Sequence, residues 1–433
     1  MGSHGKHWAP VLSGDLAREA LGAVDDVAKD LRLTFCADPA GPAWSHFSER
    51  YGSLSGGQAG LALFFSYLDR SQPDRGNDVI AANCLDRAIE WMSSAETSVG
   101  LFTGFAGVAW ALEHLRAEIV DPQAEDLGAD VATFLLKLAD ETPWQGELDL
   151  IEGLAGLCLY GLERLPLPDS RELIEATATR LYEAAVIRDD GSSWLTAPER
   201  LIPMRRGQYP NGNFNLGLAH GVPGIVGALA LAEAAGIIQP KNQLVLRDAV
   251  RWLRGQRLSP GERSQFPSWV GGTQPPQPTR LAWCYGDLGI ALALHAAALA
   301  IGEETWEQLA LEIARGAAVR PADTCDVVDA GFCHGAAGLG HQFNRLFQKT
   351  GDELFREAAV YWLRLTLELR SPGEGVGGFR ARGPDRADQE TWLADPGLLT
   401  GAAGVGLALL SAATDVEPKW DRLFLCSARD DGS

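Results

Sequence analysis

Two cysteines, Cys284 and Cys333, have the residue type and the spacing for metal chemistry. Each stands two positions before the first glycine of a Gly-x-x-Gly motif, in the segments "WCYGDLG" and "FCHGAAG". His334 directly follows Cys333, so the three side chains form a Cys₂His set of ligands suited to zinc. Three protein ligands leave one position of a tetrahedral zinc ion open, as in catalytic sites. The matched spacing therefore predicts one catalytic zinc ion at Cys284, Cys333 and His334.

The position immediately before the first glycine also carries reactive side chains. His220, Tyr285 and His334 occupy it in three copies of the motif. If equivalent positions face the same end of a repeated structure, these three side chains share one cavity. The remaining cysteines and several histidines are expected to be inert core or surface residues: Cys36, Cys84, Cys158, Cys325, Cys426, His46, His114, His295 and His341.

The elements that must position these residues come from an internal repeat. Gly-x-x-Gly followed by an apolar helical run occurs seven times, with first glycines at Gly57, Gly104, Gly153, Gly221, Gly286, Gly335 and Gly401. An amphipathic helical pattern precedes each copy, and such a helix can cover a fully apolar one. We expect the paired glycines to allow close approach of a neighbouring helix. The sequence predicts an all-α fold, an α/α toroid of seven inner and seven outer helices.

The repeats favour one domain with several additions. We expect a single catalytic domain over 13–426, with an N-terminal tail at 1–12, partly an expression scar, and a C-terminal tail at 427–433. Three segments exceed the repeat length and are rich in turn residues: the insertion 187–216, where short strands are expected, and the long loops 258–280 and 370–397.

Composition limits the function classes. The 433 residues include 57 acidic and 37 basic side chains, a formal charge of −20, which argues against nucleic acid as a partner. No apolar run approaches the roughly 18 residues that span a bilayer, and the N-terminus has no apolar signal core. Seven scattered cysteines favour free thiols or metal ligands over a disulfide framework. These features predict a cytoplasmic protein.

The segments "WCYGDLG", "CHGAAG" and "LAHGVPG" resemble the defining motifs of the lanthionine synthetase C-like proteins, the lanthipeptide cyclases. The resemblance covers nearly the whole chain, because the fold of that family is a seven-fold α/α toroid. A stand-alone chain of this length is similar to the class I bacterial cyclases. The resemblance implies zinc ligands at Cys284, Cys333 and His334 and an acid/base histidine at His220.

The resemblance further implies supporting roles for Asp149, Arg280 and Tyr285, although Glu152 lies close to Asp149 in the sequence. It implies addition of peptide cysteine thiolates to dehydroalanine or dehydrobutyrine, which forms lanthionine or methyllanthionine thioether rings. Arg280 would stabilise the enolate, and His220, oriented by Asp149, would protonate the α-carbon. The implied partners are a dehydrated precursor peptide of leader plus core, a separate dehydratase and a membrane exporter complex.

Three other functions are compatible with parts of the sequence. A glutathione-binding or glutathione-transferring member of the same family would share the zinc site. A glycosidase-type toroid could use two carboxylates such as Asp149 and Asp287, but it would leave the cysteine–histidine pattern unexplained. A non-catalytic scaffold would be favoured by loss of a ligand or of His220, and neither is lost.

The insertion 187–216 is expected to hold the leader of a peptide substrate. Trp194, Tyr209 and Phe214 would supply contact area, and the pair Arg205–Arg206 would meet an acidic or carbonyl-rich partner. The alternative is a connector that only bridges two repeats.

We expect the purified protein to hold about one zinc ion per chain, because three soft ligands stand in matched positions. Cys284→Ala or Cys333→Ala should lose the metal and the activity together, whereas the fold, which has its own large core, should survive. Elemental analysis and circular dichroism measure the two effects. Absence of stoichiometric zinc after chelator-free purification would count against the site.

Overall fold

The computed structural model describes residues 7–39, 41–94, 97–119, 126–384 and 389–428. Parts of the expected tails, residues 1–6 and 429–433, and residues 385–388 of the third long loop therefore lie outside the described residues. The chain divides into two compact units: unit 1 comprises 1–98, 103–124 and 327–421, and unit 2 comprises 99–102, 125–326 and 422–433. Each unit is described by itself.

A helix begins one residue after the first glycine of every repeat, and we call these the inner helices. In unit 1 they are α2 (Gln58–Ser71), α4 (Phe105–Ile119), α13 (Ala336–Thr350) and α15 (Ala402–Ala413). In unit 2 they are α6 (Leu154–Arg164), α9 (Val222–Ala234) and α11 (Asp287–Ile301). Most of their described side chains are buried on every face, as the apolar sequences of most of them predict, although α13 also buries polar side chains such as Gln342 and Asn344. Among the described residues, no helix combines the length and apolarity needed to cross a membrane.

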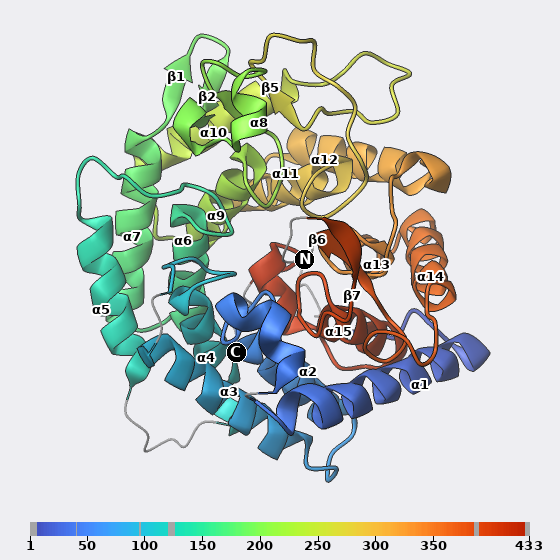
Figure 1. Cartoon of the computed structure of the whole chain (residues 1–433). Helices are drawn as coiled ribbons and strands as arrows, with labels where there is room; N and C mark the ends of the chain where they lie inside the picture. Colours follow the sequence, from blue (N-terminus) through green and yellow to red (C-terminus); the bar gives the residue numbers. More distant parts are fainter. Residues whose placement is uncertain (1–6, 40, 95–96, 120–125, 385–388, 429–433) are drawn as a thin grey trace. The chain divides into compact units, whose positions relative to one another are not determined.

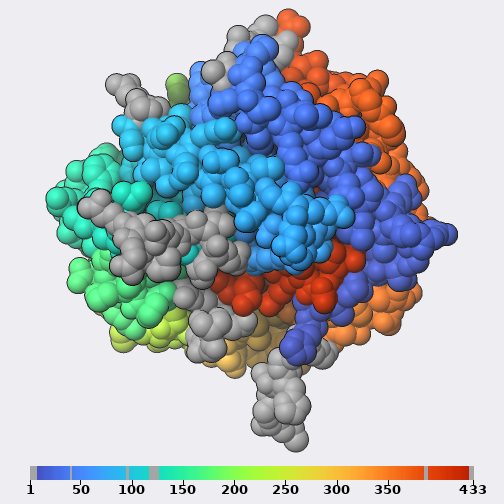
Figure 2. Space-filling view, turned by 90° about the horizontal axis from the view of Figure 1, so that it is seen from below, coloured from blue at the N-terminus to red at the C-terminus, as the bar shows by residue number. Residues whose placement is uncertain are grey.

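An amphipathic helix precedes each inner helix in the chain. These are α1 (Gly14–Asp30), α3 (Asn77–Ser94) and α14 (Glu353–Glu368) in unit 1, and α5 (Leu127–Ala139), α7 (Pro168–Glu183), α10 (Pro240–Arg254) and α12 (Glu304–Ala318) in unit 2. Within unit 1, α3 packs on α2, α14 on α13, and α1 on α15; within unit 2, α7 packs on α6, α10 on α9, and α12 on α11 (Figure 1). Figure 2 shows the surface that the N-terminal segments of unit 1, coloured blue, present on one face. Apolar helices covered by amphipathic ones are therefore present in both units, but the pairing differs from the expected one. Each of α3, α7, α10, α12 and α14 packs on the inner helix that precedes it in the chain, and α1 packs on α15, whereas the repeat order predicted packing on the inner helix that follows.

The second glycine of the repeat permits a close contact, but mainly with a backbone carbonyl of its own loop and not, as expected, with a neighbouring helix. A Cβ atom at Gly338 would lie 1.7 Å from the carbonyl oxygen of Phe332, and one at Gly404 would lie 2.0 Å from that of Leu398. In each case the carbonyl belongs to the residue six positions earlier, in the loop that leads into the same helix. The second glycine is thus required chiefly because each loop folds back onto the first turn of its own helix.

The insertion contains the expected short strands. Unit 2 has β1 (Val186–Arg188), β2 (Gly191–Ser193), β3 (Leu195–Thr196), β4 (Asn213–Asn215) and β5 (Trp269–Val270), together with α8 (Pro203–Arg206) and the 3₁₀ helices η3 (Pro198–Arg200) and η4 (Ala322–Thr324). β1 pairs with β2, and β3, β4 and β5 form an antiparallel sheet in that order. The sheet joins the insertion 187–216 to the long loop 258–280.

Unit 1 has additional short elements of its own. They are the π-helix η1 (Leu31–Cys36), the 3₁₀ helix η2 (Pro42–Arg50) and the hairpin of β6 (Ala381–Pro384) and β7 (Glu390–Leu393). The 3₁₀ helix η5 (Lys419–Phe424) begins in unit 1 and ends in unit 2. The hairpin lies in the segment 370–397, which the sequence predicted to be a long loop too rich in proline and glycine to form a helix.

The expectation that Tyr209 and Phe214 contact a ligand is wrong, because both are buried and line neither cavity beside His220, whereas Trp194 is buried and lines a cavity of about 270 Å³. Trp194, Tyr209 and Phe214 are only 3%, 6% and 5% exposed, respectively. The indole Nε1 of Trp194 donates a hydrogen bond to the carbonyl oxygen of Leu181 (2.8 Å), and the ring of Phe214 packs against Trp252. These side chains form the core that fixes the insertion on unit 2, because a small sheet needs apolar burial to be stable.

We expect Gly338→Ala to lower the free energy of unfolding by about 1–3 kcal/mol or more, because the added methyl group would overlap a backbone carbonyl that cannot move freely. Gly22→Ala is a matched control within a helix, since nothing lies within 4 Å of its Cβ position, and it should stabilise the protein by about 0.4–1 kcal/mol. Urea unfolding measures both. Equal effects of the two substitutions would contradict this account of the repeat.

Candidate active site

The loops that lead into the inner helices, here called approach loops, bring the predicted residues of unit 2 together. The N–H of Leu150 donates to the carbonyl oxygen of Ala219 (3.2 Å), and the N–H of Ala219 donates to that of Cys284 (3.4 Å). Three approach loops therefore lie side by side, held by backbone hydrogen bonds. They carry Asp149, His220 and the Cys284–Tyr285 pair, residues that are far apart in the sequence.

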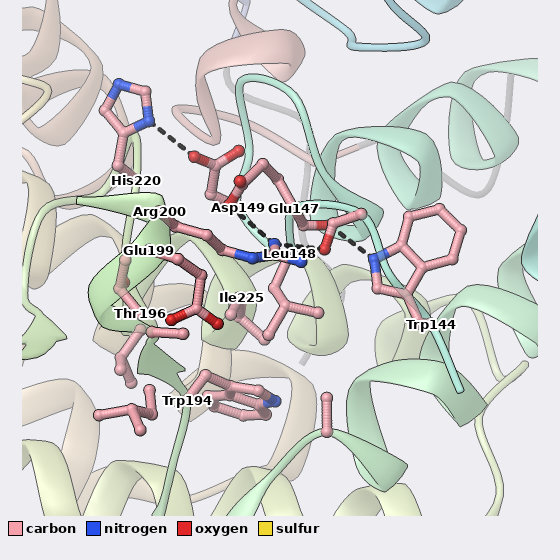
Figure 3. A pocket seen from close by; sticks show the side chains of 16 residues that line it. Trp144, Glu147, Leu148, Asp149, Trp194, Thr196, Glu199, Arg200, His220 and Ile225 are labelled. Atoms are coloured by element: carbon pink, nitrogen blue, oxygen red, sulfur yellow. Dashed lines mark hydrogen bonds and ion pairs between the residues drawn. The ribbon is translucent and has the colours of Figure 1, made fainter. Parts of the chain in front are cut away.

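His220 and Asp149 form a direct hydrogen bond. The distance from Nδ1 of His220 to Oδ2 of Asp149 is 2.6 Å (Figure 3). The other carboxylate oxygen of Asp149 accepts a hydrogen bond from the N–H of Glu152 (2.8 Å), so the carboxylate is fixed at both oxygens. The Asp149 side chain is 13% exposed, whereas that of His220 is 47% exposed. The carboxylate thus orients an accessible imidazole and leaves its Nε2 for proton transfer.

The surroundings of His220 raise its pKa above the usual 6.5. Partial burial disfavours the imidazolium, but the hydrogen bond to Asp149 and the charges of Asp149, Cys284 and Glu152 outweigh that effect. Protonation of His220 therefore stabilises the folded chain. This contribution is complete below about pH 6.5 and is lost as the pH rises through the higher pKa of the folded state.

Four of the predicted residues line one cavity of about 660 Å³: Asp149, His220, Arg280 and Tyr285. The hydroxyl of Tyr285 accepts a hydrogen bond from Nδ2 of Asn215 (3.0 Å). Burial raises the pKa of Tyr285 to about 12, so the phenol keeps its proton and remains a donor near neutral pH. Arg280 is exposed and supplies a positive charge to the cavity.

A smaller cavity of about 270 Å³ lies against the same histidine (Figure 3). Arg200 from η3 lines it, forms an ion pair with Glu147 (3.2 Å) and donates to the carbonyl oxygens of Gln145 and Gly146. Trp144 Nε1 donates to the carbonyl oxygen of Glu147 (2.9 Å). These contacts fasten the insertion to the loop that carries Asp149.

The predicted metal ligands are also close to one another. Cys284 and Cys333 are each 8% exposed, and the N–H of Cys333 is fixed by the carbonyl oxygen of Leu399 (2.7 Å). One ligand atom from each of Cys284, Cys333 and His334 lies within 4.8 Å of the other two. Two thiols and an imidazole at this spacing could hold a metal ion, and donors of this kind are among those that zinc prefers.

Three polar residues that the sequence analysis missed shape the approach loops. Side-chain oxygens of Asn215, Asp329 and Asp395 accept hydrogen bonds from N–H groups two residues later, those of Gly217, Gly331 and Gly397 (2.8, 3.0 and 2.7 Å, respectively). Each stands six residues before the first glycine of its repeat, in an Asx-x-Gly-x-x-x-Gly pattern. This pattern is a turn signal that a longer motif would have revealed.

Asp287, the second carboxylate of the glycosidase alternative, has a structural role. It is 2% exposed, and its carboxylate accepts hydrogen bonds from the N–H groups of Gln265 and Phe266. Burial raises its pKa although these N–H groups oppose that shift. The structure therefore does not support a glycosidase site in which the carboxylates of Asp149 and Asp287 face the same cavity.

Comparisons with known proteins agree over most of the chain. The family model described as "Lanthionine synthetase C-like protein" matches residues 49–425. The nisin biosynthesis protein NisC of Lactococcus lactis subsp. lactis is 25% identical over 315 residues, which cover 66% of this chain and 72% of that protein. A solved structure of nisin cyclase matches with a TM-score of 0.71 at 20% identity and covers 96% of this chain and 98% of that one. The likeness to this structure shows that the chain has an α/α toroid fold.

We expect Asp149→Asn to lower the pKa of His220, because the substitution removes the carboxylate charge that favours the imidazolium. In this variant, any reaction step that needs protonated His220 should therefore slow down at a lower pH than in the wild-type protein. Glu199→Gln is a matched control, since Glu199 lines the smaller cavity without contributing to that shift. NMR titration of the ring Cε1–H of His220 measures the pKa. An equal decrease in both variants would show that the hydrogen bond is not the cause.

Proposed function

Because the chain belongs to the lanthionine synthetase C-like family, we propose that it is a zinc-dependent lanthipeptide cyclase that closes thioether rings in a dehydrated precursor peptide. The observation that carries the proposal is the set of three soft donor atoms, from Cys284, Cys333 and His334, within 4.8 Å of one another. The similarity to NisC, whose name refers to nisin biosynthesis, supports the same activity. We further propose that residues 13–426 act as one catalytic domain.

The donor set fits a zinc ion that keeps one position open for substrate. Bound zinc would lower the pKa of a substrate cysteine thiol and so supply a thiolate near neutral pH. This chain's own residues would bind and orient the acceptor, a dehydroalanine or dehydrobutyrine of the same peptide, in the cavity of about 660 Å³. The cavity is large enough for a short peptide segment.

His220 transfers the proton in the proposed reaction, and Arg280 and Asp149 assist it. Sulfur bonds to the β-carbon, and the electron pair of the double bond moves toward the α-carbon and its carbonyl. Arg280 stabilises the resulting enolate oxygen, and Nε2 of His220 delivers a proton to the α-carbon. The thiol proton leaves to solvent, and His220 takes up a proton from solvent after its transfer. The peptide thus loses one proton at sulfur and gains one at the α-carbon, so its mass does not change. Asp149 is a positioning residue that keeps the imidazole in the orientation of the observed hydrogen bond.

The partners follow from this chemistry. The substrate must already contain dehydrated serine or threonine, so a separate dehydratase has to act first. We propose that both reactions take place in the cytoplasm and that a membrane exporter complex then removes the modified peptide.

Incubation with a dehydrated, cysteine-containing peptide tests the proposal. We expect the peptide to lose its free thiols without a change in mass, as measured by mass spectrometry after thiol alkylation. His220→Ala should keep its zinc but close rings about 10²–10⁴-fold more slowly, because general acid–base catalysis is lost. Arg280→Ala should also keep its zinc and be slower.

Loss of zinc from His220→Ala would make this residue a ligand and would contradict the role assigned to it. If glutathione in the reaction adds to the dehydro residue while ring closure is absent, the glutathione-transferring alternative replaces the cyclase.

A further inference from the structure

The larger cavity of unit 2 contains an arginine that the proposed mechanism does not use. Four arginines line this cavity: Arg200, Arg205, Arg263 and Arg280. Arg200 forms an ion pair with Glu147 (3.2 Å), and Arg263 forms one with Asp326 (2.7 Å). Among the residues that the structure describes, neither Arg205 nor Arg280 has a carboxylate partner. Since Arg280 has its place in the proposed mechanism, Arg205 is the cavity arginine without an assigned role.

Aromatic stacking holds Arg205 in place. Its guanidinium carbon lies 3.7 Å from the ring centroid of Trp269, and that ring packs against Tyr285 at a centroid distance of 5.3 Å. Arg205 comes from α8 in the insertion, and Trp269 comes from β5, which belongs to the same small sheet as β4. Arg205 also acts electrostatically on Tyr285, so its charge lies near the residue that follows Cys284.

The two adjacent arginines of the insertion have different roles. The guanidinium of Arg206 donates to the carbonyl oxygens of Leu201 (3.1 Å) and Glu199 (3.0 Å), so Arg206 stabilises the fold of the insertion. Among the described residues, the guanidinium of Arg205 makes no such contact with a backbone carbonyl, and Arg205 lines the cavity instead. The sequence alone cannot separate these roles.

A stacked guanidinium is well suited to bind a carboxylate. Stacking uses the face of the planar group and leaves the N–H donors at its edge for two parallel hydrogen bonds. The side chain is half-buried and already ordered, so little conformational entropy remains to be lost when a ligand binds. Three carboxylates of the cavity, those of Glu147, Asp326 and Asp149, do not compete, because they are engaged by Arg200, Arg263 and His220, respectively.

We propose that Arg205, stacked on Trp269, binds a carboxylate of the peptide substrate and thereby selects peptides with an acidic group near the reacting residues. This inference rests on the proposed function, since it deepens the substrate class of the same cavity. The carboxylate is a glutamate or aspartate side chain or the C-terminus of the peptide. A local positive group of this kind is needed to hold an acidic segment on a protein with a formal charge of −20.

Fluorescence anisotropy with labelled synthetic peptides tests the inference on the zinc-loaded full-length protein. Each peptide contains one cysteine and one dehydroalanine. One pair differs by glutamate or glutamine at a neighbouring position, and another by a free or amidated C-terminus. We expect the wild-type protein to bind a carboxylate peptide at least about 10-fold more tightly than its amide counterpart, which corresponds to the lower end of the range for hydrogen bonds to a charged group. The pair that shows the preference identifies the source of the carboxylate.

Arg205→Gln should abolish this preference, and Arg205→Lys should restore only part of it, because lysine keeps the charge but not the planar stack. Arg188→Gln is a matched control: its guanidinium carbon stacks on Phe214 at 4.5 Å in the same insertion, but Arg188 does not line the cavity. This variant should keep the wild-type preference.

Equal binding of carboxylate and amide peptides by the wild type, or a preference that survives in Arg205→Gln, would overturn the inference. Thiol alkylation of the same peptides measures ring closure, and it thereby separates the binding role of Arg205 from the proposed cyclase activity. Ring closure without any carboxylate preference overturns only the role of Arg205. A preference that depends on Arg205 without any ring closure supports the binding role and contradicts the cyclase.

Discussion

The structure depends on backbone hydrogen bonds that join one approach loop to the next. In unit 2 the bonds run from Leu150 to Ala219 and from Ala219 to Cys284; in unit 1 they run from Cys333 to Leu399 and from Leu399 to Ser55. Such contacts require each loop to lie flat on the first turn of its own helix, and this is possible because the second glycine of the repeat has no Cβ. Since the same loops carry the reactive residues, the constraint that builds the fold also sets the geometry of the site. A substitution that disturbs the glycine packing would therefore displace the chemistry as well as reduce stability.

Burial decides which histidine–aspartate pair can transfer protons. His341 and Asp421 form the same kind of hydrogen bond as His220 and Asp149, at 2.8 Å, but both side chains are completely buried and Asp421 also binds Arg345. Burial lowers the pKa of His341, and the Asp421 carboxylate does not reverse that shift. His220, about half exposed, has a raised pKa instead. One pair thus ties a helix to the C-terminal segment, whereas the other can exchange a proton with a ligand.

The inner helices were predictable because a single physical requirement repeats along the chain. Gly-x-x-Gly before an apolar run indicates both where the helix begins and that it is buried, and each observed helix starts one residue after the first glycine. The contact between His220 and Asp149 was not predictable from spacing, because it depends on how two loops align; the resemblance to the family supplied it. The aromatic residues of the insertion were misjudged for a related reason. In a strand of three residues such as β4, no alternation distinguishes a buried Phe214 from an exposed one, and Trp194 lies in the single-residue gap between β2 and β3.

The cavity is lined by the approach loops and by the insertion 187–216, and the backbone of the approach loops is held more firmly than that of the insertion. Asp149, His220 and Tyr285 belong to approach loops whose backbones are bonded to neighbouring loops, so their positions follow from the repeat. Arg200 and Arg205 come from the insertion, which is held by its own small core and by a few side-chain contacts such as Arg200 with Glu147. The insertion can therefore change its cavity-facing side chains without moving the acid/base pair. In the proposed function, the repeat would therefore hold the acid/base pair in place, and the insertion would supply the arginine that selects the peptide substrate.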